Sequence, residues 1–204
     1  MSNSAPPLPS SEEPEALHER AIDNIRFIRD TMESAAGFTA VPGVAQMAIG
    51  ATALAACWLA SRRTTPEGWI GVWCLEALVA LTLSAIGIAQ KSRAKGLPLG
   101  SAPNRKFAVG FMPPLVAGAV MTPALYAAGL TDKLPGTWLL LFGTAVVTGG
   151  AMSIRIVPFM GLTFMALGAL ALFCPAEWGN AFMAAGFGLI LAGFGLVIAR
   201  RYGG

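Results

Sequence analysis

Long apolar segments make up most of the chain after residue 40, without the polar and apolar alternation that marks strands. About 20 helical residues are needed to cross a hydrocarbon core of about 30 Å. Inside a bilayer, backbone groups bond within a helix or a closed barrel, so unbroken apolar runs indicate helices. The pattern predicts an all-α, polytopic transmembrane helical bundle. We expect six spans, at residues 41–60, 69–89, 107–130, 138–153, 158–173 and 181–199.

The fourth and fifth predicted spans depend on how residues 134–174 are divided. As one helix, these 41 residues would rise about 60 Å and exceed the hydrocarbon core. A hairpin is therefore preferred, and Gly149, Gly150, Arg155 and Pro158 supply suitable turn chemistry. If this hairpin does not span fully, the C-terminus moves to the other side.

The first 39 residues have a different pattern and precede the transmembrane domain at residues 40–204. Residues 1–9 are rich in Ser and Pro, which predicts a disordered tail. From Ser10, with Glu13 three residues later, a capping box opens an amphipathic helix over residues 10–39. Its apolar face includes Leu17, Ile25, Ile28 and Met32. That face rests either on the protein's own spans and the membrane interface, or on another copy or a protein partner.

Composition and charge agree with a membrane location. Apolar residues are 55% of the chain, charged residues 12%, and the mean hydropathy is +0.63, too little charge to cover a soluble domain of this size. With the N-terminus inside, ten Lys and Arg flank the cytoplasmic ends of the spans and three the outer ends, which predicts both termini in the cytoplasm. The cytoplasmic set is Arg26, Arg29, Lys91, Arg93, Lys95, Arg105, Lys106, Arg155, Arg200 and Arg201.

The loop at residues 90–106 carries five of these basic residues and no acid. We expect it to lie against anionic lipid headgroups. Docking of an acidic partner is a weaker interpretation, and nucleic-acid binding is not expected, because interleaved aromatic residues and a binding motif are missing. The expected headgroup contacts are Lys91, Arg93, Lys95, Arg105 and Lys106.

The last predicted span contains the sequence Ala-Gly-Phe-Gly-Leu twice, seven residues apart. The repeat places small residues along one face, where a neighbouring backbone can approach closely. This small-residue face packs either inside one bundle or between two copies. It consists of Ala181, Ala185, Gly188, Ala192, Gly195 and Ala199.

Glu76 is the strongest candidate for function, because it lies about two turns inside the second predicted span. An acid at that depth is costly and should face the bundle or a water-filled cavity. It is either a proton or cation site, or a hydrogen-bonded residue that ties helices together. Enzymatic chemistry is not expected, since the chain lacks a nucleophile, base and orienting acid in combination.

Metal and cofactor chemistry are not expected either. The single histidine, His18, has no second histidine to pair with it. Cys57, Cys74 and Cys174 are expected as free thiols, with a Cys57–Cys74 bridge as the alternative in an oxidising compartment.

Two further patterns concern the spans themselves. Trp69, Trp138 and Trp178 fall near span ends and are expected to anchor at the membrane interface. The third span contains Pro113, Pro114 and Pro123, which either kink it or expose carbonyls to a substrate.

The stretch Leu17-His18-Glu19-Arg20-Ala21-Ile22-Asp23-Asn24-Ile25-Arg26-Phe27-Ile28-Arg29, followed by Phe38-Thr39-Ala40-Val41-Pro42-Gly43, resembles the opening of small uncharacterised bacterial multi-span membrane proteins. The resemblance covers roughly residues 15–60 and implies a bacterial cytoplasmic membrane, with no activity attached. We therefore expect a non-enzymatic accessory or regulatory membrane component. The alternative is a small transporter or channel subunit that uses Glu76.

Overall fold

The protein is helical through most of the part that the structure describes. This computed structural model covers Arg20 and residues 22–28, 41–94, 96, 100, 102–151 and 153–202. No strand occurs among these residues. The chain divides into two units, Met1–Phe38 and Thr39–Gly204. The predicted tail at residues 1–9 and most of the predicted helix at 10–39 lie outside the described residues.

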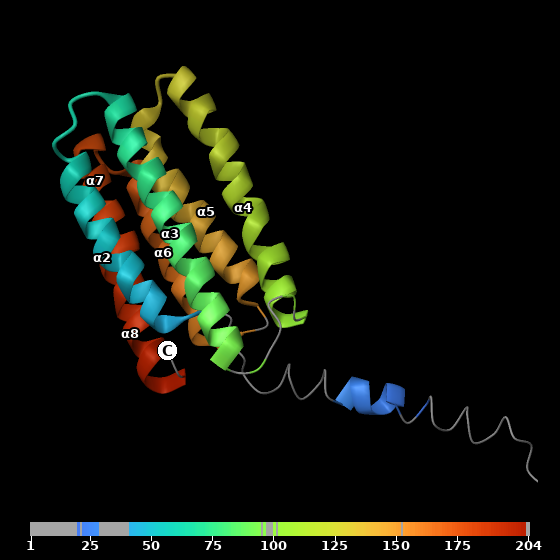
Figure 1. Cartoon of the computed structure of the whole chain (residues 1–204). Helices are drawn as coiled ribbons and strands as arrows, with labels where there is room; N and C mark the ends of the chain where they lie inside the picture. Colours follow the sequence, from blue (N-terminus) through green and yellow to red (C-terminus); the bar gives the residue numbers. More distant parts are fainter. Residues whose placement is uncertain are drawn as a thin grey trace, which may run out of the picture. The chain divides into compact units, whose positions relative to one another are not determined.

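Successive helices joined by short turns form the second unit (Figure 1). The last four elements run on from one another, and η3 is a π-helical segment within them. The bounds are α2 Gly43–Ala60, α3 Pro66–Ala94, α4 Ala102–Ala127, η1 Thr131–Lys133, α5 Leu134–Gly149, α6 Ile156–Phe173, η2 Ala176–Trp178, α7 Gly179–Met183, η3 Ala184–Ile190 and α8 Leu191–Tyr202.

Within the described residues, five helical segments are long and apolar enough to cross a membrane, which indicates an integral membrane protein. α5 has 16 residues and rises only about 24 Å, less than a hydrocarbon core of about 30 Å. The prediction of membrane helices is thus confirmed for five segments. The five are Gly43–Ala60, Pro66–Ala94, Asn104–Ala127, Ile156–Phe173 and Ala176–Tyr202.

Local chemistry explains where the observed helices depart from the predicted bounds. α3 begins three residues early, at Pro66, because the Thr65 hydroxyl accepts the N–H of Gly68 at 3.2 Å and caps the first turn. α4 ends before residue 130, because Gly129 adopts a φ of 72° and the N–H of Leu130 bonds back to Leu125. α5 ends at Gly149, four residues before the predicted end of the fourth span at residue 153.

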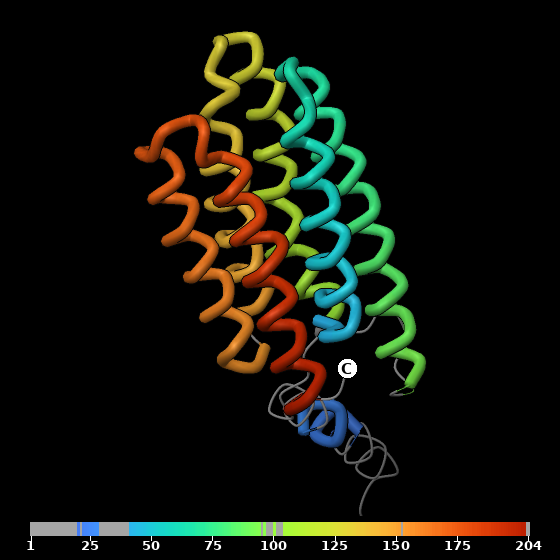
Figure 2. The backbone as a smooth tube through the Cα atoms, turned by 90° about the vertical axis from the view of Figure 1, so that its left-hand side faces the viewer, coloured from blue at the N-terminus to red at the C-terminus, as the bar shows by residue number. Residues whose placement is uncertain are grey.

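The helices pack in an order that differs from their order in the chain. α2 lies between α3 and the last helix, α7 to α8, while α5 lies between α4 and α6. Figure 2 shows α6, α8, α2 and α3 side by side. α3 and α4 barely contact each other along their lengths, but hydrogen bonds join them near both ends, from Tyr126 to Glu67 and from Asn104 to Ser92. α3 and α4 are therefore the least enclosed helices of the bundle.

Glycines let two helix pairs approach backbone to backbone. An added Cβ on Gly50 of α2 would lie 2.7 Å from the carbonyl oxygen of Gly188, and one on Gly161 of α6 would lie 2.7 Å from that of Gly143 in α5. Lipid supplies little hydrophobic drive between helices, so such close packing holds them together. The glycines recur every seven residues, at 43 and 50, 136, 143 and 150, 161 and 168, and 188 and 195.

α4 remains one helix although Pro113, Pro114 and Pro123 lie inside it. Proline has no N–H, so Pro114 leaves the carbonyl of Gly110, four residues earlier, without its helical partner. The hydroxyl of Thr148 in α5 lies 2.7 Å from that carbonyl oxygen and 2.8 Å from the carbonyl oxygen of Thr144 in its own helix, so its one proton has both acceptors in reach. A neighbouring helix thus compensates for one of the three prolines.

Aromatic side chains lie between two groups of helices, one of α2, α3 and the last span and the other of α4, α5 and α6. Phe187 of η3 lies 6.3 Å from Trp73 of α3 and 5.0 Å from Phe142 of α5, measured between ring centroids. Phe142 in turn lies 5.9 Å from Phe111 of α4. This row of rings links α3 to α4 by way of η3 and α5.

Candidate functional site

Glu76 occupies the inner face of α3, opposite α2. Its side chain is only 9% exposed, and the Thr52 hydroxyl of α2 donates to its Oε1 at 2.8 Å. Thr52 also lies 3.0 Å from the carbonyl oxygen of Ile49 in its own helix, so one hydroxyl has two acceptors in reach. An acid that is costly in lipid is thereby turned inward and given a donor.

The residues around Glu76 on α3 explain its orientation. Trp69, Trp73, Ala80 and Leu83 recur at three- and four-residue spacing on the same face, and all four pack against the buried core. Glu76 sits in the middle of that face. The indole Nε1 of Trp73, one turn away, is buried without a hydrogen-bond partner. The carboxylate therefore lies among aromatic and aliphatic side chains.

A second set of polar contacts lies nearer the end of the bundle that carries the turn after α2. The indole of Trp69 donates to Asn180 Oδ1 at 2.7 Å, and the thiol of Cys57 lies 3.3 Å from the carbonyl oxygen of Asn180. Asn180 belongs to α7, so these contacts tie α2 and α3 to the last span. Cys57, Cys74 and Cys174 are free thiols in the structure.

The tryptophans expected as interface anchors do not behave alike. Trp69 and Trp138 are half-buried, and the indole of Trp138 donates to Thr122 of α4 at 3.0 Å. Only Trp178 is exposed, at 57%. Two of the three thus tie helices together.

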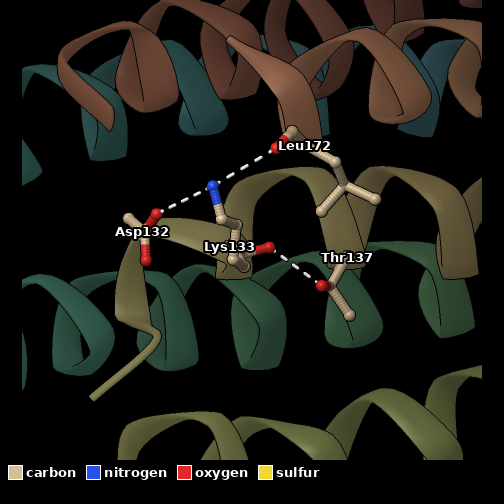
Figure 3. Close-up of polar contacts among 4 residues, drawn as sticks. All are labelled: Asp132, Lys133, Thr137 and Leu172. Atoms are coloured by element: carbon tan, nitrogen blue, oxygen red, sulfur yellow. Dashed lines mark hydrogen bonds and ion pairs between the residues drawn. The ribbon is translucent and has the colours of Figure 1, made fainter. Parts of the chain in front are cut away.

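Lys133 joins two helix ends, at the end of the bundle that carries the turn after α2. Figure 3 shows its contacts. Its ammonium pairs with Asp132 at 2.9 Å and donates to the carbonyl of Leu172 at 3.3 Å. Leu172 lies in the last turn of α6, whose carbonyls have no partner within the helix. The Thr137 hydroxyl donates to the Lys133 carbonyl at 2.8 Å. Lys133 thus connects the start of α5 with the end of α6.

Charge is distributed unevenly between the two ends of the bundle. The starts of α2, α4 and α6 and the ends of α3, α5 and α8 form one end, which we call the basic end. Its described charged residues are all cations, whereas Glu67, Asp132 and Glu177 lie at the opposite end with three cations. The cations of the basic end are Lys91, Arg93, Arg105, Lys106, Arg155, Arg200 and Arg201.

Lys91 differs from the expected headgroup contact, because its side chain is only 6% exposed. Its ammonium donates to the carbonyl of Val41, just before α2, at 3.2 Å. Beside it, Asn104 of α4 donates to the buried Ser92 at 3.0 Å. These contacts join α2, α3 and α4 at the basic end. Arg93, Arg105 and Lys106 are exposed, and Lys95 lies outside the described residues.

The small-residue face of the last span packs inside the bundle, against α2. Gly188, Ala192, Gly195 and Ala199 each lie within van der Waals reach of the Gly43 or Gly50 positions. Ala181 and Ala185 continue the same helix in α7 and η3. The Ala-Gly-Phe-Gly-Leu repeat predicted one side of this contact. The other side, the seven-residue spacing of Gly43 and Gly50 in α2, is also present in the sequence but was not part of the prediction.

The first unit shows a short helical stretch at Ile22–Ile28, with Arg20 also helical. Ile25 and Ile28 are 65% and 55% exposed, and Asp23 pairs with Arg26 at 3.8 Å. Leu17 and Met32, the other members of the predicted apolar face, lie outside the described residues.

The described residues include no group of three or more His, Cys, Asp and Glu side chains that could hold a metal ion. His18 is not among them. Comparison with known proteins finds no family model, curated protein or solved structure that matches the chain.

Proposed function

We propose that this membrane protein is a non-enzymatic accessory or regulatory component, whose N-terminal helix contacts a protein partner through Leu17, Ile25, Ile28 and Met32. The observation that carries the proposal is the exposure of Ile25 and Ile28 on a helical segment outside the bundle unit. Exposed aliphatic side chains at i and i+3 are the pattern by which an amphipathic helix docks into an apolar groove.

The packing of the bundle supports a scaffold in preference to a conduit. Aromatic rings occupy the centre, glycine contacts join helix backbones, and Glu76 is held by Thr52. Two grooves on the surface of the described part are shallow and apolar, and Glu76 lines neither of them.

The proposed topology has six spans, with both termini in the cytoplasm of a bacterium and the bundle in its inner membrane. α5 is short, but α4 and α6 flank it and seven of its residues are buried, so protein rather than lipid surrounds much of it. The basic end faces the cytoplasm, in keeping with the excess of Lys and Arg on cytoplasmic segments. A reporter that is active only in the cytoplasm should work when fused after residue 204 and fail when inserted at residues 62–64.

Site-specific photocrosslinking in native membranes tests the partner proposal. A photoreactive amino acid at Ile25 or Ile28 should give one reproducible protein adduct, identified by mass spectrometry, whereas the same group at Asp23, on the polar side, should give little. Ile25→Glu should abolish the adduct formed from position 28. Equal adducts from positions 23 and 28, or adducts with lipid alone, would refute the proposal.

A transporter or channel subunit is the second candidate, and the inward-facing Glu76 is what favours it. In vesicles that contain the purified protein, Glu76→Gln should abolish proton or cation flux if a charged carboxylate is the conducting group. Thr52→Val provides the control, because it removes the hydrogen bond and keeps the acid. Flux that is absent from the wild type, or unchanged in Glu76→Gln, excludes this role.

A further inference from the structure

An apolar groove of about 230 Å³ lies on the outer surface of the bundle, between the start of α6 and the last span. Leu189 is 64% exposed at one end of it, and the ring of Phe194 packs 6.1 Å from Phe159, measured between centroids. No charged side chain lines the groove. Its lining residues are Ile156, Leu189, Ile190, Gly193, Phe194 and Val197.

Gly193 deepens the groove without serving the packing of the bundle. A Cβ at Gly188 or Gly195 would collide with α2, whereas a Cβ at Gly193 would have no heavy atom within 4 Å. Close helix packing therefore does not explain a glycine here. Leu189 and Ile190, at the far end, belong to the π-helical segment η3, and such segments occur frequently at functional sites.

Two arginines stand at the other end of the groove. Arg155 directly precedes Ile156, and Arg200 lies three residues beyond Val197, on the helix face that also carries Gly193 and Val197. Both are exposed, and the basic end has no acid among its described residues. An anionic group would complement this end of the groove.

We propose that the groove holds one acyl chain of an anionic phospholipid, whose phosphate is bound by Arg155 and Arg200. The dimensions fit such an occupant. From Leu189 to Val197 the helix rises about 12 Å, close to the roughly 15 Å depth of one leaflet of the hydrocarbon core. Arg200 lies less than one helical turn further on, at the level where the headgroup begins. The proposal does not depend on the N-terminal partner.

Native mass spectrometry of the protein released from nanodiscs of phosphatidylglycerol and phosphatidylcholine tests the assignment. The wild type should retain one phosphatidylglycerol. Gly193→Leu fills the groove and should reduce this retention at least tenfold. Gly71→Leu is the matched control, since a Cβ at Gly71 on α3 also meets nothing within 4 Å, and it should leave retention unchanged.

The double variant Arg155→Gln/Arg200→Gln tests the headgroup without altering the groove. Each arginine near an anionic lipid contributes about a fivefold change in affinity, so the preference for phosphatidylglycerol should fall roughly thirtyfold. Equal retention of both lipids by the wild type would overturn the proposal, as would identical behaviour of Gly193→Leu and Gly71→Leu. A dimer without lipid that Gly193→Leu dissociates would assign the groove to a second copy instead.

Discussion

Replacing Thr148 by Val removes the hydroxyl that compensates for Pro114, and its cost can be estimated from the structure. The carbonyl of Gly110 would lose its donor at 2.7 Å and gain no other, because Pro114 has no N–H and lipid supplies none. Hydrogen bonds between membrane helices average about 0.6 kcal/mol and reach about 1.7 kcal/mol. An acceptor left unsatisfied costs about 1–3 kcal/mol. We expect Thr148→Val to lower the free energy of unfolding by about 1–2 kcal/mol.

A double-mutant cycle with Pro114→Ala isolates this effect. Alanine restores an N–H that can bond to Gly110 within α4, so Thr148→Val should then cost less than about 0.5 kcal/mol. Thr144→Val is the control, because the Thr144 hydroxyl donates at 2.9 Å to Leu140, within its own helix. The free energies of unfolding are measured in mixed micelles by adding increasing amounts of a denaturing detergent and following tryptophan fluorescence. If Thr148→Val costs the same with and without Pro114, the compensation is refuted.

Three further substitutions test other contacts. Gly50→Ala should destabilise the protein by at least about 2 kcal/mol, since its Cβ would overlap the Gly188 backbone, whereas Gly71→Ala should be neutral or stabilising. Thr52→Val should cost about 1–2 kcal/mol by leaving Glu76 without a donor, and an unchanged unfolding midpoint would show that this hydrogen bond is unimportant. Gly129→Ala should lower the free energy of unfolding by about 1–2 kcal/mol, because the positive φ of Gly129 is unfavourable for alanine. A lower midpoint of thermal unfolding would show this loss.

The membrane helices could be predicted from sequence because hydropathy is a property of each segment alone. The same reasoning placed Glu76 on the inside of the bundle, since only one direction avoids lipid. It could not identify Thr52 as the donor, because that requires knowing which helices are neighbours. Lys91 was expected at the headgroups for the same reason: its partner, the Val41 carbonyl, is 50 residues away in the chain.

Helix ends and lengths were harder to predict than helix positions. Hydropathy continues past residue 127, but Gly129 ends α4 through its backbone conformation. The prolines of α4 predicted either a kink or exposed carbonyls. The structure shows one helix, and only the structure identifies Thr148 of α5 as the residue that reaches the carbonyl freed by Pro114. Such effects depend on pairs of residues far apart in the sequence.

Glu76, the acid in the middle of α3, helps to fix the angle at which that helix sits about its own axis. Leu75, Leu78 and Leu81 are exposed on its outer side. Most other faces of α3 are also apolar enough to lie against lipid. Turning Glu76 outward would cost about 2.5–3.5 kcal/mol, a penalty that no other α3 residue in the middle of the membrane imposes. Together with the packing of Trp69 and Trp73 on the same face, this one acid gives a largely apolar helix a defined rotation about its axis, and replacing it with leucine would remove the penalty for exposing that face to lipid.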